Sequence, residues 1–265
     1  KNGVLVRSRK FNLHQSTGNH LYQAQRFSEW KADEIIYLDI TRDGEYNIYL
    51  GDNTIGSSSS NRNNTNESKN NIIDIIKDLS KVTRIPLTIG GKIKNLEDIR
   101  IRLRAGADKV TINSAAIENP SFISEAAKEF GSQCIVISVD VKKDINSTIP
   151  KWDIYKFYGK EKVDISLESW IEEIQTRGAG EILIQSIDND GQGKGYDLDL
   201  INKVNQISRV PIICLGGVGS FEHFKEGFES HARIALAAAN IFHFTEQSVL
   251  NAKKYLRQNN FNVRV

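Results

Sequence analysis

The feature that most constrains the fold of this chain is an internal repeat. Residues 85–117 read IPLTIGGKIKNLEDIRIRLRAGADKVTINSAAI, and residues 210–242 read VPIICLGGVGSFEHFKEGFESHARIALAAANIF. In each stretch an apolar run after a proline reaches a Gly-Gly pair, and an amphipathic helix and a second apolar run follow. Each copy therefore predicts a strand, a glycine turn, a helix and another strand. Such units bury their apolar faces against neighbouring units, so the repeat constrains the architecture of the whole chain.

Apolar runs bounded by turn residues alternate with helical patterns along the sequence. The predicted strands are residues 34–40, 86–90, 108–113, 134–140, 181–187, 211–215 and 233–239. The predicted helices are residues 20–31, 70–81, 96–105, 120–130, 167–177, 197–207 and 221–229. Apolar strands that alternate with helices are typical of a parallel sheet covered on both faces. A barrel of eight such units takes about 250 residues, so we expect one α/β domain over residues 1–265, a (β/α)8 TIM barrel with a two-fold half-barrel repeat.

Two segments depart from this regular pattern. Seven core strands are one fewer than a closed barrel needs. Residues 4–11 alternate like a short ribbon without a helix directly before them, so we expect the first barrel strand to lie upstream of Lys1. Residues 42–71 form an insertion, of which 51–71 are rich in Ser and Asn and almost free of apolar residues. Such a segment cannot bury enough surface to order itself, so we expect a flexible loop.

Composition limits the classes of function. The formal net charge is +2 and charged residues make up 26% of the chain, so neither a nucleic-acid nor a membrane surface is indicated. No apolar run approaches the roughly 20 residues that span a bilayer, and no signal peptide opens the sequence. We therefore expect a cytoplasmic protein. Cys134 and Cys214 lie in predicted strands and are expected to be small core residues without a disulfide. No metal site and no cofactor are expected.

Polar and glycine residues gather where the predicted strands end, which is where barrels of this type bind ligands. Asp140 ends the apolar strand CIVISVD and is a candidate general acid or base, with a loop-capping carboxylate as the alternative. The pairs Gly90-Gly91 and Gly216-Gly217 let the backbone approach an anion at a helix N-terminus. Two equivalent turns on opposite sides of a barrel suggest a ligand with a phosphate at each end. A purely structural role of the glycines is the alternative.

Three charged residues stand at the opposite, amino-terminal ends of strands. Glu34, Lys109 and Glu181 start the runs EIIYLD, KVTIN and EILIQS. If one strand lies upstream, these are the second, fourth and sixth strands, and alternate strands fill the same layer of a barrel interior. The spacing therefore suggests a charged ring that closes the barrel floor, with solvated strand starts as the alternative.

At these residues the sequence resembles the HisF family, the cyclase subunits of imidazole glycerol phosphate synthase. Matching segments include DEIIYLDIT, PLTIGGKI, GADKVTINSAAIENPSFI, RGAGEILIQSIDNDGQGKGYD and PIICLGGVGSFEHF, and the match runs from about Gly3 to the last residue apart from 42–71. The resemblance implies a (β/α)8 barrel with a glutaminase partner at its N-terminal face. It implies that ammonia crosses the floor to a bis-phosphorylated phosphoribulosyl-formimino nucleotide, which is cleaved and cyclised in histidine biosynthesis.

The resemblance also assigns roles to individual residues. The general acid or base falls on Asp140, the ammonia gate on Glu34, Lys109 and Glu181, and the partner contact on Asp108. Binding of substrate and phosphate falls on Arg7, Gly91, Asn113, Ser114, Asp190, Gly191, Gly216, Gly217, Ala239 and Asn240.

The sequence departs from the family pattern at the rim of the barrel. Lys92 replaces the third glycine of a usual Gly-Gly-Gly, Leu215 a usual hydroxyl residue, and Gln185 a usual threonine near the end of the sixth strand. Such departures are typical of paralogues that accompany a glutaminase and an amidotransferase in making amidino sugars for surface polysaccharides. A paralogous ammonia conduit, non-catalytic or with an altered substrate, therefore stays open beside the cyclase. A phosphate-binding barrel without ammonia chemistry is the third hypothesis.

Overall fold

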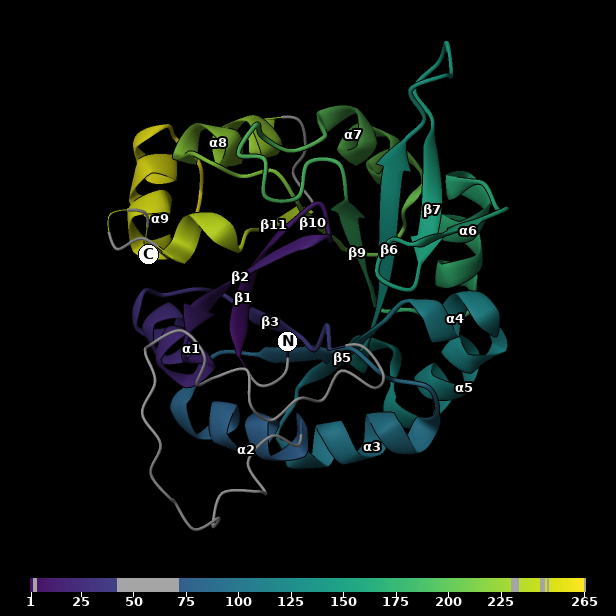
Figure 1. The fold of residues 1–265 in the computed structure, drawn as a ribbon, viewed down its shortest axis with the longest axis horizontal. Coiled ribbons are helices and arrows are strands. Elements are labelled where there is room, and N and C mark those ends of the chain that lie inside the picture. The colour runs from purple at the N-terminus through teal and green to yellow at the C-terminus, as the bar shows by residue number, and fades with distance from the viewer. Residues whose placement is uncertain (2–3, 42–71, 230–233, 244–245, 247, 265) are drawn as a thin grey trace, which may run out of the picture.

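The fold, seen in a computed structural model, is a curved parallel sheet surrounded by helices (Figure 1). The structure describes residues 1, 4–41, 72–229, 234–243, 246 and 248–264, so the expected loop over 42–71 lies outside the described residues. Seven parallel strands pair in the order β11 (Ile234–Ala237), β10 (Ile212–Leu215), β9 (Glu181–Ser186), β6 (Ile135–Lys143), β5 (Lys109–Ile112), β4 (Leu87–Gly90) and β3 (Ile35–Leu38). A (β/α)8 barrel-type fold is thereby confirmed.

The two halves of the sequence repeat form the same unit. The first copy gives β4, α3 and β5, and the second gives β10, α8 and β11. Asn95 caps the first turn of α3 by accepting the Asp98 N–H at 2.9 Å, and Gly106 ends the helix in the left-handed conformation that a helix C-terminus favours. Local capping chemistry thus sets where the helix begins and ends, and the buried apolar strands on either side set where it packs.

Helices cover the outside of the sheet, and their ring closes (Figure 1). They are α1 (His20–Glu29), α2 (Ile72–Val82), α3 (Leu96–Ala105), α4 (Ser114–Glu118), α5 (Ser121–Phe130), α6 (Leu167–Thr176), α7 (Leu198–Ile207), α8 (Phe221–Glu229), α9 (Val249–Gln258) and the 3-10 helices η1 (Ser132–Cys134) and η2 (Asn240–His243). Lys253 of α9 donates to the Asp33 carboxylate at 2.8 Å, just after α1. Phe27 of α1 also packs on Phe242 of η2, with ring centroids 6.2 Å apart. The first and last helices therefore meet, although β3 and β11 end the strand order in the described part of the chain.

Apolar side chains fill the space on both sides of the sheet. The larger core lies between sheet and helices, and β6 contributes seven successive buried residues to the two faces. A separate cluster of Val136, Leu183 and Ile213 comes from three neighbouring strands and lies on the inner face. Burial on both faces explains why the strands read as continuous apolar runs in the sequence.

The structure also adds elements that the sequence pattern did not reveal. Most predicted boundaries agree within two residues, but β6 continues to Lys143 and is followed by an antiparallel hairpin of β7 (Trp152–Lys156) and β8 (Glu161–Val163). The ribbon expected near the start is a hairpin of β1 (Leu5–Arg9) and β2 (Leu13–Gly18). The prediction that Cys134 lies in a strand is wrong: this residue ends η1 and is partly exposed. Cys214 is buried in β10. None of the described helices is long and apolar enough to cross a membrane.

Candidate active site and barrel floor

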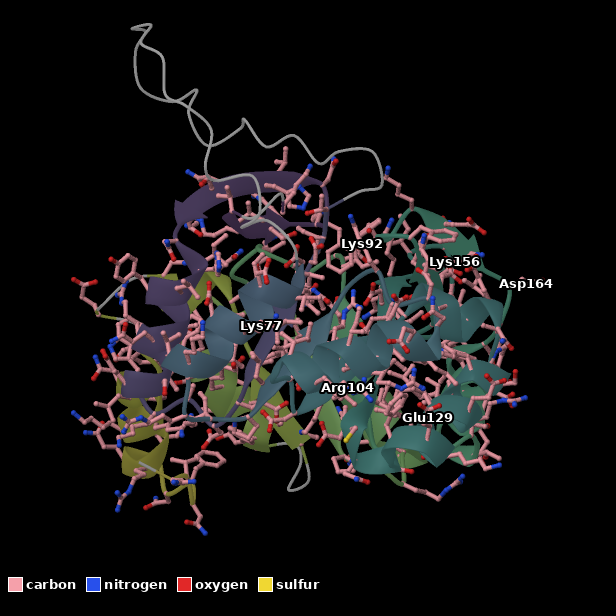
Figure 2. All side chains as sticks on the ribbon, turned by 90° about the horizontal axis from the view of Figure 1, so that it is seen from below. Lys77, Lys92, Arg104, Glu129, Lys156 and Asp164 are labelled. Atoms are coloured by element: carbon pink, nitrogen blue, oxygen red, sulfur yellow. The ribbon has the colours of Figure 1, made fainter. Side chains whose placement is uncertain are left out.

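Two ends of the barrel can be told apart in a side view. In Figure 2 Lys92 and Lys156 lie toward the end that carries the β1–β2 hairpin, whereas Arg104 and Glu129 lie nearer the other end. Lys92 follows the carboxyl end of β4, so the hairpin end is the one where the parallel strands finish. We call this end the mouth, and the end where the strands start the floor.

The three charged residues predicted at the floor come together there. The Lys109 Nζ lies 2.9 Å from Glu34 Oε2 and 2.8 Å from Glu181 Oε1, and the Thr88 hydroxyl donates to the other oxygen of Glu34. Burial lowers the pKa of the Lys109 ammonium, but the hydrogen bonds that it donates to both carboxylates outweigh this effect and leave that pKa above its ordinary value. Glu34, Lys109 and Glu181, here called the floor ring, therefore hold one fixed cation between two anions.

The interior above the floor ring is apolar on one side and polar on the other. Leu183 follows Glu181 by two residues on β9, and a strand sends alternate side chains to the same face, so both point inward. On the β5 side the Thr111 hydroxyl is buried and has no hydrogen-bond partner among the described residues. A small neutral molecule in this space would therefore contact apolar side chains on one side and could form a hydrogen bond with the Thr111 hydroxyl on the other.

Asp140 lies near the mouth end of β6 and is 8% exposed. Burial raises the pKa of its carboxyl from 3.8 to about 7, hydrogen bonds from Ser138 and Asn113 oppose this rise, and the charge of Asp190 adds to it. The Ser138 hydroxyl donates to Asp140 Oδ1 at 2.9 Å. A carboxyl group with such a pKa can accept and release a proton near neutral pH, which is what a general acid or base has to do.

The first glycine turn at the mouth is fixed by a close backbone approach and by a buried arginine. Gly91 has a φ of 97°, and a Cβ there would lie 2.1 Å from the Asp39 carbonyl oxygen, so only glycine fits. Arg102 of α3 is buried and donates from Nη2 to the Gly91 carbonyl at 3.1 Å and from Nη1 to the Asp98 carbonyl at 2.7 Å. Lys92 follows in the left-handed region with a φ of 56°. The turn is therefore held from the helix outside the barrel as well as from the neighbouring strand.

The second glycine turn follows β10 and packs on the turn that follows β9. A Cβ on Gly217 would lie 1.9 Å from the Gly195 carbonyl oxygen, and the Gly195 N–H donates to the Gly217 carbonyl at 2.9 Å. A Cβ on Gly216 would lie 2.7 Å from the Ser186 carbonyl oxygen. Tight backbone packing is thus one reason for these glycines, whether or not they also bind an anion.

Asp190, Gly191 and Asn240 connect the β1–β2 hairpin to the mouth. The Asp190 carboxylate accepts from the Ser8 hydroxyl at 2.7 Å and from the Phe11 N–H at 3.2 Å. The Asn240 amide donates to the Ser8 carbonyl at 2.8 Å, and a Cβ on Gly191 would lie 2.4 Å from that same oxygen. The hairpin is therefore fastened across the loops after β9 and β11 by contacts that the sequence pattern did not suggest.

The remaining predicted substrate and partner residues lie at different places around the barrel. Arg7 of β1 donates to Gln15 across the hairpin. Burial lowers the pKa of His243 in η2, and the positive charges of Arg7 and Arg26 lower it further. Ala239 precedes η2 and accepts the Phe242 N–H at 3.1 Å.

At the floor, Asp108 is exposed beside the floor ring, and its carboxylate accepts the Leu87 N–H at 2.8 Å. Asn113 and Ser114 follow β5 at the mouth. Asn113 donates to Asp140, and its Oδ1 is buried without a described donor.

The β7–β8 hairpin, which was not predicted, reaches over the mouth. The Phe157 N–H donates to the Ser114 hydroxyl at 3.0 Å, and the Tyr158 hydroxyl donates to the Thr41 carbonyl at 3.2 Å. A Cβ on Gly159 would touch Phe11 of the β1–β2 hairpin at 3.2 Å, so the two hairpins meet. The alternating residues of WDIYKFYGKEKVDI were the available sign of this hairpin.

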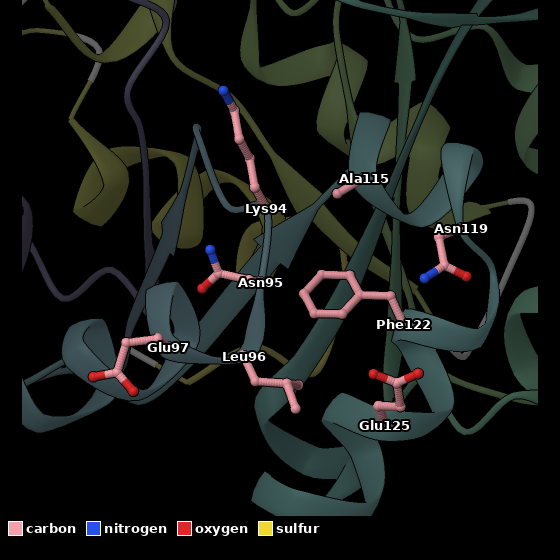
Figure 3. Close-up of a pocket in the computed structure, with 8 residues that line it drawn as sticks. All are labelled: Lys94, Asn95, Leu96, Glu97, Ala115, Asn119, Phe122 and Glu125. Carbon is pink, nitrogen blue, oxygen red and sulfur yellow. The ribbon is translucent and has the colours of Figure 1, made fainter.

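A surface groove of about 480 Å³ is lined by residues of α3, α4 and α5 and of the segments beside them. Figure 3 shows the ring of Phe122 in the groove between Leu96 and Asn119, with Lys94 at one end. None of the predicted site residues lines it. Because the titrating carboxyl group and the glycine turns lie at the mouth, the mouth is the better candidate for chemistry. Among the described residues no group of three or more His, Cys, Asp or Glu side chains is placed to hold a metal ion.

Comparison with known proteins places the chain in a family. Residues 63–248 match the family described as "Histidine biosynthesis protein". The chain is 40% identical over 265 residues to "Imidazole glycerol phosphate synthase subunit HisF" of Wolinella succinogenes, which covers all of this chain and 94% of that protein. It is 38% identical to proteins of the same name from Natranaerobius thermophilus and Hydrogenobaculum sp., over all of this chain and 95% of each of them. The chain therefore belongs to the histidine biosynthesis protein family and, within it, to the HisF group.

Proposed function

We propose that this chain is the cyclase subunit of an imidazole glycerol phosphate synthase, a lyase that works in the cytoplasm. The observation that carries the proposal is the pairing of two features at opposite ends of one barrel. The floor ring closes one end, and Asp140, whose pKa is about 7, lies near the other. The names of the relatives support the same function, and they do not favour the amidino-sugar paralogue.

The floor is proposed as the entry point for ammonia. A glutaminase partner docks on this face, and Asp108, which is exposed beside the ring, contributes to the contact. Lys109 blocks the axis while Glu34 and Glu181 hold its ammonium group. Movement of this one side chain opens the floor, and neutral ammonia then passes the apolar layer formed by Val136 and its neighbours.

The mouth is proposed as the site of cleavage and ring closure. The two phosphates of the nucleotide bind at the glycine turns on opposite sides of the mouth, where backbone N–H groups and helix N-termini favour anions. One side comprises Gly91, Asn113 and Ser114, and the other Arg7, Asp190, Gly191, Gly216, Gly217, Ala239 and Asn240. Asp140 shuttles protons while ammonia adds and the imidazole ring closes, because its carboxyl exists in both protonation states near neutral pH.

The decisive experiment uses the purified chain, ammonium chloride and the phosphoribulosyl-formimino nucleotide. We expect the unchanged chain to release the aminoimidazole nucleotide product. In Asp140→Asn kcat should fall by a factor of about a hundred or more. Asp199→Asn, an exposed acid on α7, is the matched control and should retain full activity. No product from the unchanged chain would refute the cyclase proposal, and full activity of Asp140→Asn would refute the role of that residue.

The partner is tested separately from the chemistry. A HisH-type glutaminase should co-purify with the chain and support glutamine-dependent turnover. Asp108→Lys should weaken this association, because it reverses a charge on the floor face while leaving the mouth unchanged. Unaltered glutaminase binding by this variant would contradict the proposed docking position.

A further inference from the structure

Gln185 points into the upper part of the barrel. Along β9 the side chains of Glu181 and Leu183 both face the interior, one in the floor ring and the other in the apolar layer. Gln185 is the next residue in this alternation, and it lies in register with Asp140 on the neighbouring strand. The residue is 7% exposed. The carboxamide therefore lies in the mouth beside the proposed general acid or base.

None of the described residues forms a hydrogen bond with this carboxamide. In the described part of the chain no group donates to its oxygen or accepts from its nitrogen. The hydrogen bonds that hold the Asp140 carboxyl come instead from Ser138 and Asn113. A polar side chain that is more than nine-tenths buried is unfavourable without partners unless a ligand or water completes its hydrogen bonds. The carboxamide is thus available for a ligand in the mouth.

A second unsatisfied acceptor lies on the other side of Asp140. The Oδ1 of Asn113 is buried and receives no hydrogen bond from the described residues. Asn113 follows β5, Asp140 belongs to β6 and Gln185 to β9, and these strands are adjacent in the sheet. Because the Asn113 oxygen is fully buried, the acceptors that face a ligand in the mouth are those of Asp140 and Gln185, in register on neighbouring strands, and they suit a group that carries N–H donors.

The strand order shows which part of a ligand would reach these acceptors. The β4 and β5 turns lie on one side of β6 and β9, and the β10 and β11 turns lie on the other. A molecule held by one phosphate at each side lays its middle over the two central strands. The negative groups are then at the turns, and the middle of the ligand faces Asp140 and Gln185.

We propose that Gln185 is a specificity-determining residue, which accepts a hydrogen bond from an N–H group at the nitrogen-bearing centre of a bis-phosphorylated ligand. This inference rests on the proposed function and deepens it, because it names the part of the substrate that one side chain recognises. A threonine, which the resembling family usually carries here, is shorter and offers a single hydroxyl. The longer carboxamide of Gln185 carries its acceptor further into the mouth and adds a donor.

The test compares the unchanged chain with Gln185→Met, which keeps the length of the side chain and removes both polar atoms. The matched control is Gln25→Met on the exposed face of α1. Three quantities are measured with ammonium chloride as the nitrogen source: KM for the phosphoribulosyl-formimino nucleotide, the inhibition constant of inorganic phosphate, and the pH dependence of kcat. Urea unfolding of each variant shows whether the fold has changed.

In Gln185→Met we expect KM to rise about tenfold to a hundredfold, because a ligand N–H is left without its acceptor. The inhibition constant of phosphate should stay the same, since the glycine turns are untouched, and so should the acid limb of the pH profile, since Ser138 and Asn113 still hold Asp140. The unfolding midpoint should not fall, because Gln185 forms no hydrogen bond with the residues that the structure describes. Gln25→Met should match the unchanged chain throughout.

Three results would overturn the proposal. A KM within twofold of the unchanged chain would show that Gln185 does not contact the ligand. A parallel loss of phosphate inhibition or of stability would show that the side chain supports the fold of the mouth instead. Absence of turnover in the unchanged chain would refute the proposed function itself, and with it this inference, and is distinguishable because the control variant would be inactive too.

Discussion

Replacing Asp140 by asparagine should make the protein more stable while it removes activity. The carboxyl has an ordinary pKa of 3.8 in the unfolded chain and about 7 in the folded one. Between these values the folded state binds more protons than the unfolded state, so the free energy of unfolding falls as pH rises. One pKa unit corresponds to about 1.4 kcal/mol, so the full shift amounts to about 4 kcal/mol above neutral pH.

The difference between the variant and the unchanged chain should therefore depend on pH. At roughly pH 4 the carboxyl is protonated in the folded state and only about half ionised in the unfolded chain, so the two proteins should differ in stability by less than about 1 kcal/mol. By roughly pH 8 Asp140→Asn should be more stable by about 2–4 kcal/mol, the lower figure allowing for the amide's own unmet hydrogen bonds. Ionisation of this buried carboxyl thus opposes folding.

Urea unfolding, followed by tryptophan fluorescence from pH 4 to 8, measures this difference. Asp199→Asn is the control, because that carboxylate is exposed and its ion pair with Lys143 is worth little. Its curve should run parallel to that of the unchanged chain. A pH-independent difference for Asp140→Asn, or a loss of stability at pH 8, would refute the reasoning from burial.

Three further substitutions test other parts of the barrel. Lys109→Met should lower the free energy of unfolding by about 1–3 kcal/mol, because it leaves two carboxylates unpaired. It should also lower glutamine-dependent turnover more than ammonium-dependent turnover. An equal effect on both rates would contradict the role of Lys109 at the floor. Gly217→Ala should destabilise by about 2–4 kcal/mol in urea unfolding, because its methyl group would meet the Gly195 carbonyl; wild-type stability would contradict this close approach. Ser8→Ala should raise hydrogen exchange of the β1–β2 hairpin by removing a bond to Asp190 worth about 1 kcal/mol; unchanged protection would show that the remaining contacts suffice.

Local patterns predicted the regular part of the fold well, and for an identifiable reason. The strands are buried on both faces and the helices on one, so their apolar residues recur with the expected periods. The floor ring could be predicted because Glu34, Lys109 and Glu181 stand at equivalent points of alternate strands, and the structure brings all three together. Their role as a gate stays a prediction.

Features that depend on contacts between distant segments could not be predicted in this way. The attachment of Ser8 to Asp190 joins residues that lie far apart in the chain, and nothing in either segment indicates the other. Cys134 was placed in a strand because it adjoins an apolar run, but the chain makes one more 3-10 turn before β6 begins. Gln185 could be noticed as a departure from a family pattern, whereas only the structure shows that none of the residues it describes forms a hydrogen bond with its side chain.

The contact between Arg102 and Gly91 has a consequence for how this rim can be tuned. The Arg102 guanidinium belongs to helix α3 outside the sheet and holds the Gly91 carbonyl of the glycine turn at the mouth. A shift of α3 would therefore change the geometry of that turn. We expect Arg102→Leu to alter the affinity for inorganic phosphate although the side chain lies behind the turn and not in the mouth. Substitutions on the outer face of the barrel can then change how tightly this turn binds an anion, without altering any side chain that faces the mouth.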